Sequence, residues 1–161
     1  MKKFSLIIST LFGVGYFPKA PGTAGTIIAA AVYYLLPEKW FVKFENSIIF
    51  LVIILILSVI SVFITSKAEE ILGKDNKKIV LDEFLGFFIA VLFLPKTLFI
   101  IISAFILFRI FDILKPEPVN ILQRLPKGWG VMSDDIMAAI YANVTLQIIL
   151  FFILKYSVKI I

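Results

Sequence analysis

The chain of 161 residues contains neither histidine nor cysteine. Without imidazole or thiol groups it can use no phosphohistidine, no cysteine nucleophile, no Ser-His-Asp triad and no Cys/His zinc site. Disulfides are excluded as well. Carboxylates, hydroxyls and lysine amines remain for chemistry, and this set of groups suits a hard cation such as Mg²⁺.

Charged residues are also scarce, at 17% of the chain, whereas hydrophobic residues make up 61% and the mean hydropathy is +1.05. Soluble domains are about 25% charged and about 45–50% apolar. The composition therefore predicts a membrane protein, with residues 1–161 forming a single domain. The net charge of +5 comes from scattered lysines. These favour an anionic lipid bilayer as partner, while no nucleic acid and no protein partner is predicted.

Long apolar stretches predict an all-α, polytopic membrane helical bundle with about five spans. The stretches cover residues 23–36, 47–64, 79–94, 97–114 and 136–154. The first and third are short, because a span needs about 20 residues. Residues 4–17 are shorter still and are broken by Gly13 and Gly15. They predict an N-terminal interfacial or re-entrant helix.

Basic residues between these stretches predict the orientation in the membrane. Ten lysines and arginines fall on one side of the expected spans and five, including Lys155 and Lys159, fall on the other. The side richer in basic residues is expected to be cytoplasmic.

Acidic residues stand at the ends of three of the apolar stretches, all on the expected cytoplasmic side. Asp82 and Glu83 begin the third, Asp112 ends the fourth, and Asp134 and Asp135 precede the fifth. Carboxylates beside membrane spans are costly and indicate function. A bound Mg²⁺ would relieve the repulsion between neighbouring acids. The alternative is that they stabilise helix starts, with Asp134 as an N-cap after a tight loop over residues 127–133.

Two basic residues accompany Asp112 on the same helix. Arg109, Asp112 and Lys115 follow one another at intervals of three residues, just before Pro116, and so share one face. Such a face can pair its charges internally and still present a cation to phosphate. The alternative is a charge-compensated cluster whose long side chains reach the membrane surface.

A segment rich in proline and glycine, residues 17–26, leads into the first apolar stretch. Thr23 and Thr26 lie in the expected first turns of that helix. The free N–H groups and the dipole of a helix start favour an anion such as phosphate. The alternative is a simple cap by either threonine, with Gly25 and Ala29 allowing close helix packing.

Taken together, these motifs resemble the phosphatidylglycerophosphatase A family of Mg²⁺-dependent lipid phosphatases of the bacterial inner membrane. The similarity runs from Gly13 to Asn143. Its motifs are residues 13–23, Asp82-Glu83 with Gly86, residues 108–116, and residues 128–132 with Asp134-Asp135. The resemblance implies hydrolysis of phosphatidylglycerophosphate to phosphatidylglycerol and inorganic phosphate. It also implies a multi-pass protein of the bacterial inner (cytoplasmic) membrane.

On this interpretation the acids serve as catalytic and metal-binding residues on the cytoplasmic face, and four other residues bind the phosphomonoester. The acids are Asp82, Glu83, Asp112, Asp134 and Asp135, and the phosphate-binding residues are Thr23, Thr26, Arg109 and Lys115. One alternative is a small cation- or proton-coupled transporter that uses the same acids. Another is an assembly subunit held by polar contacts between helices.

Overall fold

The computed structural model describes residues 2–157, and within that range every regular element is a helix. The all-α prediction is therefore confirmed. In chain order the elements are α1 (Lys2–Ser9), η1 (Val14–Tyr16), α2 (Pro21–Leu35), α3 (Lys39–Val42), α4 (Phe44–Leu72), α5 (Leu81–Ala90), α6 (Leu98–Leu114), α7 (Val119–Leu122) and α8 (Gly128–Ser157).

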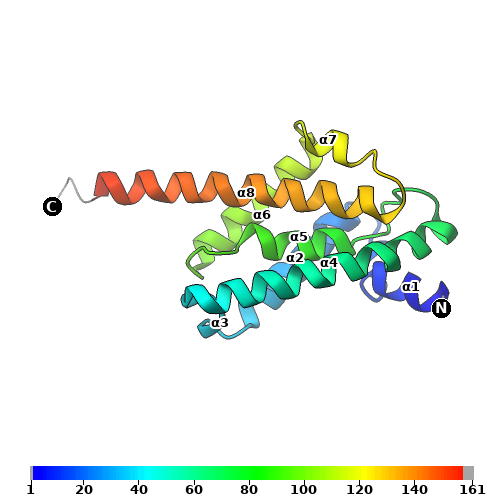
Figure 1. The fold of residues 1–161 in the computed structure, drawn as a ribbon, viewed down its shortest axis with the longest axis horizontal. Helices are drawn as coiled ribbons and strands as arrows, with labels where there is room; N and C mark the ends of the chain where they lie inside the picture. The colour runs from blue at the N-terminus through cyan, green and yellow to red at the C-terminus, as the bar shows by residue number, and fades with distance from the viewer. Residues whose placement is uncertain (1, 158–161) are drawn as a thin grey trace.

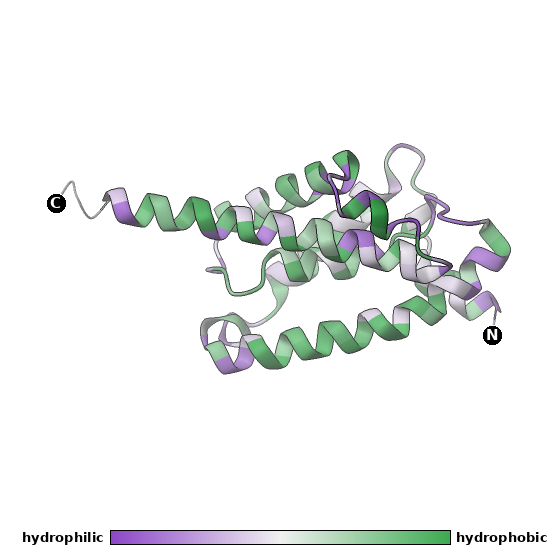
Figure 2. Ribbon diagram, turned by 45° about the horizontal axis from the view of Figure 1, so that its top comes forward, coloured by the Kyte–Doolittle hydropathy of each residue, from purple (hydrophilic) through white to green (hydrophobic). Residues whose placement is uncertain are grey.

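Two long helices, α4 and α8, extend along the longest axis of the molecule (Figure 1). They contain 29 and 30 residues, and hydrophobic residues cover most of their length (Figure 2). Among the described helices these two are long and apolar enough to cross a membrane, judged by length and composition.

The other helices that were expected to span are shorter than the prediction of about five spans requires. Helices α2, α5 and α6 contain 15, 10 and 17 residues. At about 1.5 Å per residue they cover from about 15 to about 26 Å of a hydrocarbon layer about 30 Å thick. Five full spans are therefore not confirmed.

Helix ends differ from the predicted boundaries where backbone geometry intervenes. Helix α1 stops at Ser9 because Leu11, Phe12 and Gly13 have positive φ angles, so only part of the predicted N-terminal helix forms. Helix α6 agrees closely with its predicted stretch, and the Thr97 side chain accepts a hydrogen bond from the Ile100 N–H at 3.3 Å. Lys159, which contributed to the count of basic residues, lies outside the described residues.

The short helix α5 occupies the centre of the bundle, where it packs against α2, α4, α6 and α8. Its residues from Leu85 to Ala90 are all buried. A Cβ on Gly86 would lie 2.9 Å from the ring of Phe108, so the close approach of α5 to α6 requires glycine. The acids at the start of α5 are thereby held inside the bundle.

Asn143 of α8 satisfies the backbone at the other end of α5. Its side-chain N–H groups donate to the carbonyls of Ala90 and Leu92 at 3.1 and 2.7 Å, and its own oxygen accepts from Gln147 at 2.6 Å. Carbonyls at a helix end have no partner within the helix, and water is absent from an apolar interior. Asn143 therefore allows α5 to stop inside the bundle.

Replacement of Asn143 by alanine should lower the free energy of unfolding by about 1–3 kcal/mol, because two buried carbonyls lose their donor. Thermal unfolding in detergent, followed by circular dichroism, measures this change. Val144→Ala is the matched control, because Val144 is exposed on the neighbouring position of α8. Equal stability of the two variants would contradict the capping role of Asn143.

Candidate functional site

All five predicted acids lie at one end of the bundle, where α5 begins, α6 ends and the first turns of α8 pass (Figure 1). Asp82, Asp112, Asp134 and Asp135 are buried, and the side chain of Glu83 is 14% exposed. The predicted convergence of these segments is therefore seen in the structure.

Helix α8 begins at Gly128, six residues before Asp134. The expected tight loop over residues 127–133 is therefore wrong, and so is the alternative in which Asp134 is an N-cap. The two glycines in this stretch serve close packing, because a Cβ on Gly128 would overlap the Val62 carbonyl and one on Gly130 would crowd the Gln123 carbonyl. The helix start is thus pressed against α4 and the preceding loop.

Asp82, Glu83 and Asp135 form the centre of the site. One carboxylate oxygen from each lies within 4.8 Å of the others. Within the described part of the chain, Asp82 Oδ1, Glu83 Oε2 and Asp135 Oδ2 are buried without a hydrogen-bond partner. Converging, unpartnered carboxylate oxygens are the ligands that a hard divalent cation requires, so these residues fit such an ion.

Arg109 connects this centre to Asp112. Its Nη1 atom lies 2.7 Å from Asp112 Oδ2 and 3.7 Å from Glu83 Oε1, and its side chain is 15% exposed. Its Nε atom is buried and, among the described residues, has no hydrogen-bond partner. The guanidinium therefore compensates two acids and retains a donor that an anion can use.

Lys115 performs the corresponding role for Asp134, with 2.5 Å between Lys115 Nζ and Asp134 Oδ2. Lys115 is the C-cap residue of α6, and its left-handed backbone conformation, with a φ of 45°, ends the helix there. Burial lowers the pKa of Lys115, but the hydrogen bond and charge of Asp134, together with Asp112 and Asp135, outweigh burial and raise it above its ordinary value. Lys115 therefore carries a positive charge throughout the neutral pH range.

The charges within the site do not balance. Five carboxylates face two cationic side chains, Arg109 and Lys115, in a largely buried region. Buried charges need compensation by opposite charges or hydrogen bonds. With all groups ionised, the cluster has three negative charges in excess, and one divalent cation would offset two of them.

The start of α2 contacts the site through a residue that the sequence did not single out. A Cβ on Gly22 would overlap Glu83 Oε1 and would lie 3.1 Å from Arg109 Nη2, so a side chain there would displace the Glu83 carboxylate. Thr26 is buried, and its hydroxyl donates to the Gly22 carbonyl at 2.9 Å. Thr23 lines an apolar groove on the outside of α2. The sequence signal that could have indicated this contact is the Pro21-Gly22 pair at the start of α2.

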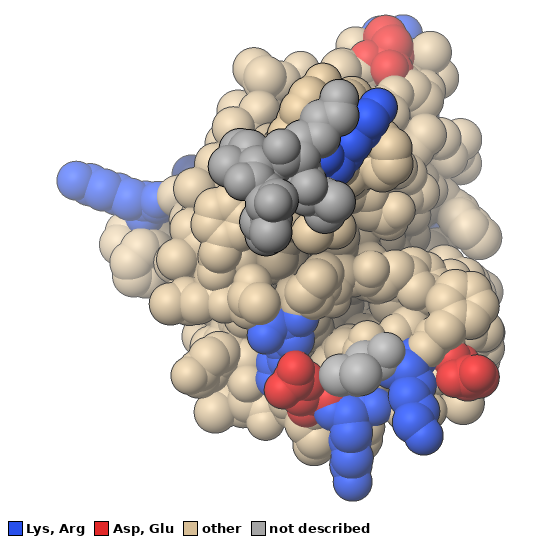
Figure 3. Space-filling view, turned by 90° about the vertical axis from the view of Figure 1, so that its left-hand side faces the viewer, with Lys and Arg blue, Asp and Glu red and all other residues tan. Residues whose placement is uncertain are grey.

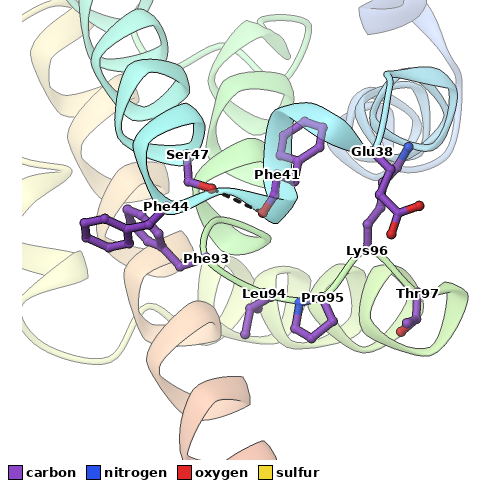
Figure 4. A pocket seen from close by; sticks show the side chains of 9 residues that line it. All are labelled: Glu38, Phe41, Phe44, Ser47, Phe93, Leu94, Pro95, Lys96 and Thr97. Carbon is purple, nitrogen blue, oxygen red and sulfur yellow. Dashed lines mark hydrogen bonds between the residues drawn. The ribbon is translucent and has the colours of Figure 1, made fainter.

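The opposite end of the molecule has a different character. Charged side chains gather along one edge of that end, and most of the remaining surface in this view is uncharged (Figure 3). A cavity of about 420 Å³ lies there, with Glu38 and Lys96 among its lining residues (Figure 4). Lys96 donates to the carbonyls of Tyr34 and Leu36 and so satisfies the end of α2. The polar contacts of Lys96 at this end therefore satisfy carbonyls at the end of α2.

An apolar helical bundle with two helices of membrane-spanning length, and with buried carboxylates, an arginine and a lysine clustered together, is typical of membrane-associated helical proteins. The particular family follows from comparison with known proteins. The model of the family "Phosphatidylglycerophosphatase A" matches residues 7–150, and the chain belongs to that family. The family resemblance seen in the motifs is confirmed, and the chain is a phosphatase.

The curated relatives match most of the chain, but they carry two different names. A Haemophilus influenzae protein named phosphatidylglycerophosphatase A is 36% identical, over 96% of each chain. An Escherichia coli protein of the same name is 31% identical, over 83% of this chain and 76% of its own length. A Bacteroides thetaiotaomicron protein provisionally named phosphatidylinositol-3-phosphatase is 35% identical, over 89% of this chain and 91% of its own. No solved structure compared with the chain matches it.

Two acid-to-amide changes should have opposite effects on stability in EDTA. Asp82 has no ion-pair partner among the described residues, so Asp82→Asn removes repulsion and should raise the midpoint of thermal unfolding by about 2–4 °C, equivalent to about 1 kcal/mol. Asp112→Asn breaks the 2.7 Å ion pair with Arg109 and should lower the midpoint. Changes of the same sign in both variants would contradict this charge assignment.

Proposed function

We propose that the protein hydrolyses the phosphomonoester of phosphatidylglycerophosphate, releasing phosphatidylglycerol and inorganic phosphate, with Mg²⁺ bound by its buried acids. Family membership supports the reaction class. The observation that carries the proposal is the approach of Asp82, Glu83 and Asp135 within 4.8 Å, each with an unpartnered oxygen, next to Arg109. A phosphate group can be bound there between a metal ion and a guanidinium.

In this proposal Asp82, Glu83 and Asp135 bind the metal directly. Asp134 and Asp112 pair with Lys115 and Arg109 and hold them in position. We propose that both acids also take part in metal binding or proton transfer. When bound, Mg²⁺ neutralises phosphate charge and lowers the pKa of an attacking water. All-oxygen ligands favour Mg²⁺ over softer metals.

The cationic side chains bind the phosphate oxygens. Arg109 offers its buried Nε–H, and Lys115 remains protonated at neutral pH. Both charges stabilise the negative charge on the phosphoryl oxygens as water attacks phosphorus and the bond to the lipid oxygen breaks. The start of α2, with Thr23 and Thr26, adds the positive end of a helix dipole on the side of Gly22.

The site lies at the polar end of the bundle, which suits a substrate whose acyl chains remain in the bilayer while its headgroup reaches the acids. We place this end at the cytoplasmic face of the bacterial inner membrane, because the basic residues predict that orientation. The transporter alternative is not favoured, since the chain belongs to a phosphatase family and its acids gather at one end rather than at mid-depth.

The headgroup deserves a direct comparison because the relatives differ in name. Two are named for phosphatidylglycerophosphate and one for phosphatidylinositol 3-phosphate. Both lipids present a phosphomonoester to the same kind of site. We favour phosphatidylglycerophosphate because the family model that covers residues 7–150 carries that name.

Purified protein in detergent should release phosphate from phosphatidylglycerophosphate in the presence of Mg²⁺ and not in EDTA. Asp134→Asn and Asp135→Asn should each reduce the rate on the order of 10²–10³-fold, because each removes a charge that orients or binds the reacting groups. Phosphate release is measured colorimetrically, with phosphatidylinositol 3-phosphate and phosphatidate assayed in parallel.

Glu45→Gln is the matched control, since it makes the same carboxylate-to-amide change at an exposed residue in the first turn of α4, at the opposite end of the bundle. Its rate should equal that of the unmodified protein. Faster hydrolysis of phosphatidylinositol 3-phosphate would replace the proposed substrate. Absence of hydrolysis of all three lipids by a folded protein would refute the proposed reaction.

A further inference from the structure

A second polar groove lies at the same end of the bundle as the acids but shares no residue with them. It has a volume of about 710 Å³ and is formed by α1, the end of α4, Lys74 of the following loop, and the start of α8. Its lining has two parts. Phe63 and Trp129 supply exposed apolar surface, and Lys67, Lys74 and Lys127 supply positive charge.

The groove lies where α4 changes from apolar to polar sequence. Residues 48–64 of α4 are almost entirely hydrophobic, whereas the helix continues with Ser66, Lys67, Glu69 and Glu70 (Figure 2). If α4 spans a bilayer, this change places the groove at the level of the lipid headgroups. Tryptophan and lysine are both favoured at that level.

Two of the three lysines in the groove remain available to a ligand. Glu70 is paired with Lys67 at 3.2 Å and with Lys2 at 3.4 Å. Glu69 accepts a hydrogen bond from the Asp75 N–H at 2.9 Å and so holds the loop. Among the residues that the structure describes, Lys74 and Lys127 have no ion-pair partner. Three lysines and two glutamates line the groove, so its net charge is positive.

The packing of α8 on α4 fixes one wall of the groove. The Gly128 N–H donates to the Ser66 hydroxyl at 3.1 Å, and the space around Gly128 admits no side chain. Lys127, immediately before it, has a left-handed backbone with φ 55°. These constraints hold Lys127 and Trp129 at the groove, so the cationic and apolar parts are placed side by side before any ligand binds.

We propose that this groove binds one molecule of an anionic phospholipid that is not hydrolysed. The phosphodiester lies between Lys74 and Lys127, and an acyl chain follows Phe63 and Trp129. A phospholipid joins an anionic phosphate to apolar acyl chains, and the groove likewise has lysines beside apolar residues. The inference does not depend on the proposed reaction, because the groove and the acids share no side chain.

Trp129 provides a direct measurement of this binding. The chain has two tryptophans, so Trp40→Phe leaves Trp129 as the single fluorophore. In detergent micelles, phosphatidylglycerol with brominated acyl chains should quench Trp129 at about a 25-fold lower mole fraction than brominated phosphatidylcholine, since each of the two lysines contributes about fivefold to binding an anionic headgroup. Equal quenching by the two lipids would overturn the proposal.

Charge variants in the same Trp40→Phe background locate the site. Lys74→Gln with Lys127→Gln should abolish the preference for the anionic lipid. Lys39→Gln with Lys43→Gln, an equal loss of charge at the opposite end of α4, should retain it. Circular dichroism verifies that both proteins are folded. A preference that survives the Lys74 and Lys127 changes would refute the site, and relief of quenching by millimolar inorganic phosphate would assign the groove to free phosphate instead.

Discussion

The structure depends on the burial of five carboxylates at one end of an apolar bundle. Arg109 and Lys115 each pair with an acid, and the remaining oxygens of Asp82, Glu83 and Asp135 converge without partners among the described residues. Buried like charges are tolerated only when something compensates them. The short central helix α5 follows from this constraint, because its first turn must lie inside the bundle for its acids to meet those of α8.

Much of the candidate site could be predicted from sequence because it depends on the spacing of residues within one helix and on which helix ends lie on the same side of the bundle. Arg109 and Asp112 are three residues apart on one helix, so their ion pair follows from helical geometry. Helices that cross a layer in alternate directions bring every second helix end to the same side. Acids before or at the start of the third and fifth stretches were therefore expected to meet, and Asp82, Glu83 and Asp135 do.

Other features could not be predicted because glycine occurs both in loops and at positions in helices where another segment packs closely. The stretch from Gly128 to Gly130 has the composition of a loop, yet it forms the first turn of α8, where the missing side chains admit neighbouring backbone. Gly22 permits a similar close approach to Glu83 and Arg109. The length of α5 could not be predicted for a related reason: an apolar stretch such as residues 79–94 gives no sign that Asn143, far along the chain, binds the carbonyl of Ala90 at the end of the helix.

Because α5 is short, the acids at its start occupy only part of the depth of the bundle. From Asp82 to Ala90 the helix covers only about 12 Å, less than half of a hydrocarbon layer about 30 Å thick. On the proposed function, the reactive groups therefore belong to a single leaflet, and the remaining depth of the bundle anchors the protein. A lipid in the opposite leaflet would have to flip before its phosphate could reach the acids, so the way the chain inserts also decides which pool of lipid it can consume.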